Sequence, residues 1–139
     1  MRRLTTSARP AGVFQSLSRS SWHFGPWPGR SWWQKRQDAV NARLKQGGVD
    51  LLLIGDSITH GFDNTGRKYW DLYYAPRNAV NMGFGGDWTH HVLWRLDHCD
   101  FSAVKPKLAV VLIGTNNSNR DDCTPREIAD GVIAVCGRL

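Results

Sequence analysis

Short apolar runs alternate along the chain with segments whose apolar residues recur at helical spacing. Three runs, residues 49–54, 79–82 and 108–113, have the length and composition of buried strands in a parallel sheet. Strands that alternate with helices favour a parallel sheet covered by helices and joined by right-handed crossovers. The pattern therefore predicts an α/β fold with three layers, α/β/α.

Helices are expected between these strands. The first begins near Ser31, buries Trp33, Val40 and Leu44, and stops at the glycines of residues 47–48. The other expected helices are a piece at about 68–74 ending at Pro76, a helix at about 88–96 that buries Val92, Leu93 and Leu96, and a helix capped by Thr124, Pro125 and Glu127 that buries Ile128, Val132 and Val135.

Small or polar residues follow each expected strand: Ser57, Gly86 and Asn116. The carboxyl ends of parallel strands form the edge where open α/β sheets place their ligands. The Ser57 hydroxyl there can act as a nucleophile, while the N–H groups of Ser57 and Gly86 and the Asn116 amide can hold an oxyanion. Taken alone, the motif around Ser57 also fits a serine that only caps the following helix, instead of a nucleophile.

Three polar neighbours are expected to support these residues. Asp56 and Asp87 each stand beside a candidate site residue, and we expect them to accept backbone N–H bonds that hold the turns presenting Ser57 and Gly86. Asn117 is expected to play a similar supporting role.

The ordered blocks GDSIT, NMGFGGDWTHHVLWRL and LIGTNN resemble the first three blocks of the SGNH (GDSL-type) hydrolases, in particular the subgroup of platelet-activating factor acetylhydrolase catalytic subunits. The resemblance implies Ser57 as nucleophile and Gly86 and Asn116 in the oxyanion hole, with no cofactor and no metal. It implies a flavodoxin-like sheet in the order 2-1-3-4-5, of which this chain holds about three of five strands. The domain is then residues 31–139, the N-terminal part of an SGNH hydrolase domain.

The fourth block of that family is an Asp-x-x-His near the C-terminus, which supplies the base and the residue orienting it. We interpret this chain as lacking that block. Serine is a poor nucleophile without an adjacent base, so we expect little or no activity. His60 has the best spacing for a substitute base, but surface or helix-end imidazoles are the favoured interpretation for His60, His90, His91 and His98.

Two classes of function stay open. One is a serine esterase that hydrolyses a carboxylic ester or acetyl group on a lipid or carbohydrate through an acyl-enzyme. The other is a non-catalytic remnant that binds a ligand or a partner subunit. The third strand should be an open edge, and open apolar edges promote association. We therefore expect a marginally stable or self-associating chain, a homodimer included.

Charge is uneven along the 139 residues: residues 1–30 carry five Arg and no acid, whereas residues 31–139 carry 13 basic and 12 acidic groups. The first segment is interpreted as a disordered basic tail, with a transit peptide or non-native coding sequence as alternatives. Nucleic-acid binding is not expected, because no recognisable module accompanies the charge. No apolar stretch is long enough for a transmembrane helix, and the cytoplasm is the default compartment.

The three cysteines are Cys99, Cys123 and Cys136. Their odd number and the absence of a C-x-x-C spacing predict buried free thiols, without a disulfide framework or a zinc site.

Overall fold

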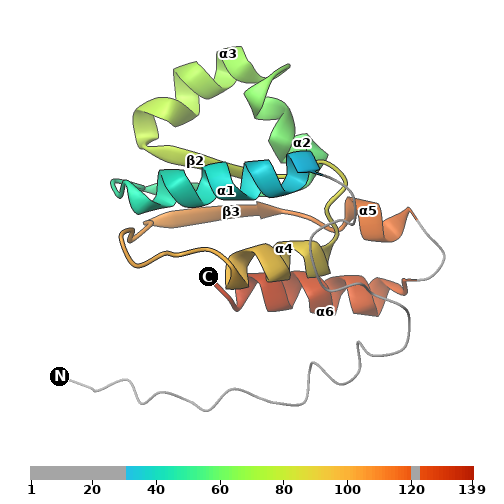
Figure 1. Ribbon diagram of the computed structural model, residues 1–139. Coiled ribbons are helices and arrows are strands. Elements are labelled where there is room, and N and C mark those ends of the chain that lie inside the picture. Colours follow the sequence, from blue (N-terminus) through green and yellow to red (C-terminus); the bar gives the residue numbers. More distant parts are fainter. Residues whose placement is uncertain (1–30, 120–122) are drawn as a thin grey trace.

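The computed structural model describes residues 31–119 and 123–139, so the expected basic tail lies outside the described residues. Three parallel strands form the sheet in the order β2-β1-β3 (Figure 1): β1 (Leu51–Gly55), β2 (Ala79–Gly83) and β3 (Leu108–Leu112). In this register Leu51 lies between Ala79 and Leu108. The three predicted strands and their order are confirmed.

Three long helices accompany the sheet, α1 (Ser31–Lys45), α4 (Thr89–Asp97) and α6 (Pro125–Cys136), as the apolar spacing predicts. Thr124 and Glu127 form the predicted cap of α6, in which Thr124 N donates to Glu127 Oε2 at 2.8 Å. The shorter helices are α2 (Ser57–His60), η1 (Gly61–Asp63), α3 (Arg67–Tyr69), η2 (Trp70–Tyr74), η3 (Ala75–Arg77) and α5 (Thr115–Ser118).

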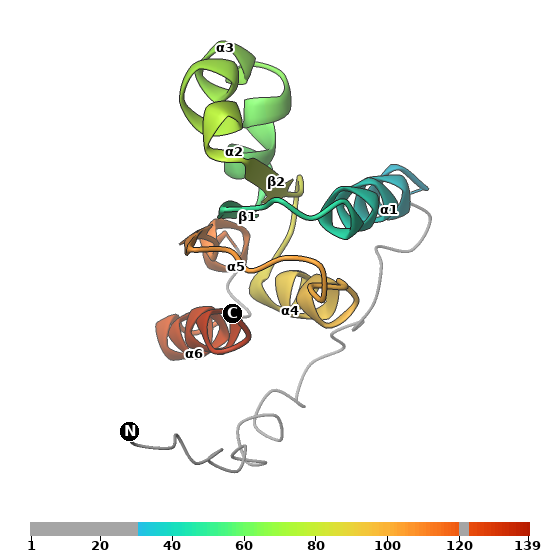
Figure 2. The same cartoon turned by 90° about the vertical axis from the view of Figure 1, so that its left-hand side faces the viewer.

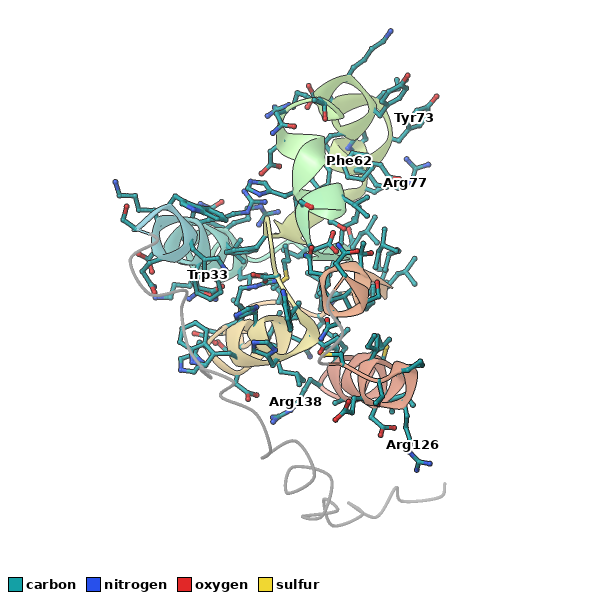
Figure 3. The ribbon with its side chains drawn as sticks, turned by 90° about the vertical axis from the view of Figure 1, so that its right-hand side faces the viewer. Trp33, Phe62, Tyr73, Arg77, Arg126 and Arg138 are labelled. Carbon is teal, nitrogen blue, oxygen red and sulfur yellow. The ribbon has the colours of Figure 1, made fainter. Side chains whose placement is uncertain are left out.

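One face of the sheet packs against α1 and α4. Side chains of alternate strand positions, among them Leu52, Ile54 and Met82, join the buried core that these helices complete. Trp33 of α1 is completely buried, with its ring centroid 5.4 Å from that of Trp94 in α4. Figure 3 shows Trp33 extending from α1 toward α4, and Figure 2 shows α6 beside α4.

The opposite face of the sheet carries α2. Gly55 and Gly83 lie on this face, and a Cβ atom added to Gly55 would be 2.2 Å from Oγ1 of Thr59. A Cβ atom on Gly83 would be 2.3 Å from the backbone nitrogen of His60. The two glycines therefore allow α2 to lie directly on the strands. Helices on both faces give the predicted three layers, and residues 61–77 form a lobe above β2 (Figures 1 and 2).

β3 is the edge strand that the sequence predicts, but its burial differs from expectation. Leu108, Val110 and Leu112 are 59%, 48% and 50% exposed, whereas Ala109 and Val111 pack against the core. The register puts Leu112 beside Gly55, on the face where α2 covers β1 and β2. Within the described part of the chain no helix extends this cover over β3, so one face of the strand is exposed.

A glycine in the middle of α6 provides a test of the α4–α6 contact. A Cβ atom at Gly131 would lie 2.6 Å from Oγ1 and 2.9 Å from Cβ of Thr89. Gly131→Ala should therefore lower the free energy of unfolding by about 1–3 kcal/mol despite the better helix propensity of alanine. Gly137→Ala is the matched control, because its nearest contact is 3.4 Å away. Equal urea-unfolding midpoints for the two variants would contradict the observed packing.

Candidate active site

The turn after β1 presents Ser57 to solvent. Ser57 is the exposed first residue of α2, and the buried carboxylate of Asp56 accepts the N–H of Ile58 at 2.9 Å. This is the kind of backbone contact expected of Asp56. The turn is therefore fixed by a side chain that is 1% exposed, while the Ser57 residue beside it is exposed.

Direct hydrogen bonds join the ends of the three strands. Phe84 N, after β2, donates to Gly55 O, at the end of β1, at 3.1 Å. The Asn116 side chain, after β3, donates from Nδ2 to Asp87 O at 2.8 Å. The Asn117 Oδ1 accepts the N–H of Thr89 at 3.1 Å, which ties the same strand end to the start of α4. The segments that carry Ser57, Gly86 and Asn116 are thus neighbours in space.

Asp87 plays a different part from the one expected. Its carboxylate does not hold a turn through backbone N–H groups; it accepts Nε1 of Trp33 at 2.8 Å and Nε of Arg95 at 2.7 Å. The Asp87 and Arg95 side chains are both 0% exposed. Burial opposes ionisation of each partner, raising the pKa of Asp87 and lowering that of Arg95, while their contact favours the charged forms.

Arg95 is the important site residue that sequence reasoning missed. Its guanidinium carbon lies 3.9 Å from the ring centroid of Phe84, and Nη2 reaches Gly55 O at 3.5 Å. A signal was present: Arg95 stands three residues after Val92, next to Leu96, on the apolar face of α4. A charged residue on the buried face of a helix requires a buried partner.

Gly86 lies in the loop between β2 and α4 with φ +82°, a backbone conformation that favours glycine. Among the residues that the structure describes, none accepts a hydrogen bond from its N–H. The Asn116 amide has two N–H donors, and one of them is used on Asp87 O. Donors therefore remain available on two of the strand-end segments.

The outcome differs among the four candidate histidines: His98 is exposed and His60 is the last residue of α2, as expected, whereas His90 and His91 are less exposed than expected. His91 is 6% exposed and its Nδ1 accepts the N–H of Trp88 at 3.0 Å, so it is a buried helix-start residue rather than a surface one. His90 is half-buried, and burial lowers its pKa to about 4. His60 Nδ1 accepts the N–H of Gly85 at 3.2 Å. The lone pair on that nitrogen is therefore engaged, which disfavours His60 as a substitute base.

The interpretation that Asp-x-x-His is missing needs one correction. Asp87 and His90 have this spacing, inside the second block rather than near the C-terminus. Both carboxylate oxygens of Asp87 are used by Trp33 and Arg95. Asp87 therefore does not orient His90, and this pair does not replace the fourth block.

Other candidate chemistry is limited in residues 31–119 and 123–139. This part of the chain has no group of three or more His, Cys, Asp or Glu side chains placed to hold a metal, nor a helix long and apolar enough to cross a membrane. None of the three cysteines, all of which lie among the described residues, forms a disulfide. Cys99 and Cys123 are partly buried, but Cys136 is exposed, so the prediction of burial is wrong for Cys136.

Comparisons with known proteins identify the family of the chain. The GDSL-like Lipase/Acylhydrolase family matches residues 53–139. Platelet-activating factor acetylhydrolase IB subunit alpha2 of Rattus norvegicus is 35% identical over 103 residues, 74% of this chain and 43% of that protein. The Gallus gallus alpha2 subunit is 34% identical with the same coverage. The Homo sapiens alpha1 subunit is 32% identical over 74% of this chain and 42% of its own length.

The chain therefore belongs to the GDSL-like lipase/acylhydrolase family, a class of hydrolases acting on ester bonds. It spans less than half the length of these relatives.

Breaking the buried pair should destabilise the chain strongly. Asp87→Asn leaves the Arg95 charge without its counter-ion, so we expect a loss of about 3–5 kcal/mol in the free energy of unfolding. Adding Arg95→Met removes that charge, and the double variant should lose less than the sum of the single variants. A double-mutant cycle from urea unfolding measures this coupling. Strictly additive losses would show that the two side chains do not depend on each other.

Proposed function

We propose that this chain carries the nucleophile and oxyanion donors of a serine ester hydrolase. Ser57 attacks the ester carbonyl, and the oxyanion is held by the N–H groups of Ser57 and Gly86 and by the Asn116 amide. The alcohol leaves, and water then hydrolyses the acyl-enzyme. The observation that carries the proposal is the set of direct hydrogen bonds that join the three strand ends, together with an exposed serine two residues after the end of β1.

Turnover by the chain is proposed to be slow. Nδ1 of His60 and Nδ1 of His91 each accept a backbone N–H, and the ring of His98 is stacked on Trp94 at 3.7 Å. The carboxylate of Asp87 is held by Arg95. These contacts engage three of the histidines and the carboxylate of Asp87, which disfavours an Asp–His pair built from them beside Ser57. Acylation without an adjacent base is slow.

We propose a short acyl group, with acetate as the first candidate. The named activity of the relatives is acetyl hydrolysis of platelet-activating factor, a property of those proteins. A lipid or carbohydrate leaving group is compatible with this proposal. Comparing p-nitrophenyl acetate with longer p-nitrophenyl esters, each against Ser57→Ala, tests the preference.

A fluorophosphonate probe tests the nucleophile without requiring turnover. The Ser57 oxygen attacks phosphorus, fluoride leaves, and the hydroxyl proton passes to solvent. Because attack by a serine without an adjacent base is slow, we expect peptide mass spectrometry after a long incubation to find the adduct on Ser57 and to lose it in Ser57→Ala. Ser102→Ala, which changes an exposed loop serine, is the matched control and should label normally. Label spread equally over exposed serines would overturn the proposal.

The same probe tests the oxyanion donors. Asn116→Ala should slow labelling of Ser57 by about 10²–10³-fold, because one donor to the developing negative charge is lost. Ser118→Ala in the same short helix is the control, since its hydroxyl only donates to Thr115 O. Thermal unfolding of both variants separates loss of the donor from loss of structure. An unchanged rate in a folded Asn116→Ala would remove Asn116 from the site.

Association through β3 is a second candidate property. Leu108, Val110 and Leu112 form an exposed apolar row on an edge strand. Edge strands of this kind pair readily with another chain. We propose that the row supports self-association, which is compatible with either an esterase or a binding role.

Val110→Lys should shift the chain toward monomer, because a charge on an edge strand opposes edge pairing. Light scattering after size exclusion over a range of concentrations measures the change. Thr115→Lys, at an exposed position beyond the strand, is the control for added charge alone. A wild-type chain that stays monomeric at all concentrations would exclude the proposal.

A further inference from the structure

His60 joins the nucleophile helix to the loop that carries Gly86. It is the last residue of α2, and its Nδ1 accepts the N–H of Gly85 at 3.2 Å. The imidazole is stacked on Trp32, with ring centroids 6.0 Å apart and an angle of 23° between planes. This hydrogen bond connects a side chain three residues after Ser57 with the residue directly before Gly86.

The bond to Gly85 depends on the protonation state of His60. A neutral imidazole that accepts at Nδ1 carries its proton on Nε2, whereas the imidazolium donates from both nitrogens and accepts from neither. The charged groups that face the ring are Arg36 of α1 and Asp63 of η1, which are paired with each other at 2.5 Å. Burial lowers the pKa of His60, Arg36 lowers it further, and Asp63 opposes them. The ring is therefore neutral at pH 7.

The loop around Gly86 is anchored on both sides. Before Gly86, Gly85 N is held by His60. After it, Asp87 is held through its carboxylate by Arg95 and through its carbonyl by Asn116. Loss of the His60 bond would leave Phe84, whose N–H donates to Gly55 O, as the nearest anchored residue before the left-handed Gly86. Shifts of about 1 Å in a positioned group are enough to reduce rates on the order of 10²-fold.

We propose that His60 is a positioning residue for the Gly86 loop: its neutral imidazole holds Gly85 in place, and protonation of Nδ1 releases the loop. The hydrogen bond itself does not require Ser57 to be a nucleophile. Its effect on reactivity rests on the proposed function, in which the N–H of Gly86 is an oxyanion donor.

Two variants distinguish the effect of losing the hydrogen bond to Gly85 from the effect of protonating the His60 ring. His60→Asn keeps an acceptor close to the position of Nδ1 but has no proton to gain, and His60→Ala removes the acceptor. Circular dichroism and thermal unfolding at pH 7.5 establish that each variant is folded. Because folding lowers the pKa of His60, the bond is complete above about pH 6.5 and is lost as the pH falls through the lowered value.

The first measurement follows the Gly85 amide by NMR as the pH is lowered from 8 to 5. In the wild type we expect its nitrogen and proton shifts to titrate with the midpoint of the His60 ring. In His60→Asn the Gly85 shifts should stay constant. A Gly85 amide that does not respond while the His60 ring titrates would overturn the proposal, whatever the activity of the chain.

The second measurement is the rate of fluorophosphonate labelling of Ser57 over the same pH range. Relative to His60→Asn, the wild-type rate should fall as His60 becomes protonated, and His60→Ala should be slower at every pH, by about tenfold or more. Parallel pH profiles with equal rates in all three proteins would exclude a positioning role. If Ser57 is labelled in none of them, the proposed function fails, while the NMR titration still decides the role of His60.

Discussion

The buried contact between Asp87 and Arg95 is the constraint on which the site depends. Removing two charges from water is costly, and it is tolerated here because each makes close hydrogen bonds. Trp33 donates the second hydrogen bond to the Asp87 carboxylate, and Nη2 of Arg95 donates to the carbonyl of Gly55. The backbone carbonyl of Asp87 accepts a hydrogen bond from the Asn116 amide. One ion pair thus links all three strand ends. Nη1 of Arg95 is buried without a partner among the described residues. Small displacements of this network therefore carry a large cost in free energy.

Glycine supplies the complementary constraint on the other face of the sheet. Gly55 and Gly83 allow α2 to lie on the strands at distances that no other residue permits. This close approach sets Ser57 at the carboxyl end of the central strand and brings His60 within hydrogen-bond distance of Gly85. The Gly86 loop is consequently held on one side by the ion pair between Asp87 and Arg95 and on the other side by the imidazole of His60.

Features that depend on neighbouring residues were predictable from the sequence, and features that depend on tertiary contacts were less so. The strands, their order and the cap at Thr124 followed from local patterns or family resemblance. The role of Asp87 did not, because a carboxylate beside a glycine loop fits both a turn and an ion pair. Only the folded chain places Arg95 next to it. The exposure of Leu108 and Cys136 was missed for a related reason, since an apolar residue is buried only where another element covers it.

The three proposed oxyanion donors lie on segments that differ in how well they are packed. Ser57 follows the central strand, and the Gly86 loop is fixed by residues that are fully buried. Asn116 follows β3, an edge strand whose outer face is exposed. Exposed edges open more easily than packed core elements, because fewer buried contacts must be broken. We therefore expect the proposed oxyanion stabilisation to be weakest at Asn116, and we expect an interaction that covers β3 to strengthen the proposed site by ordering this residue rather than by touching Ser57.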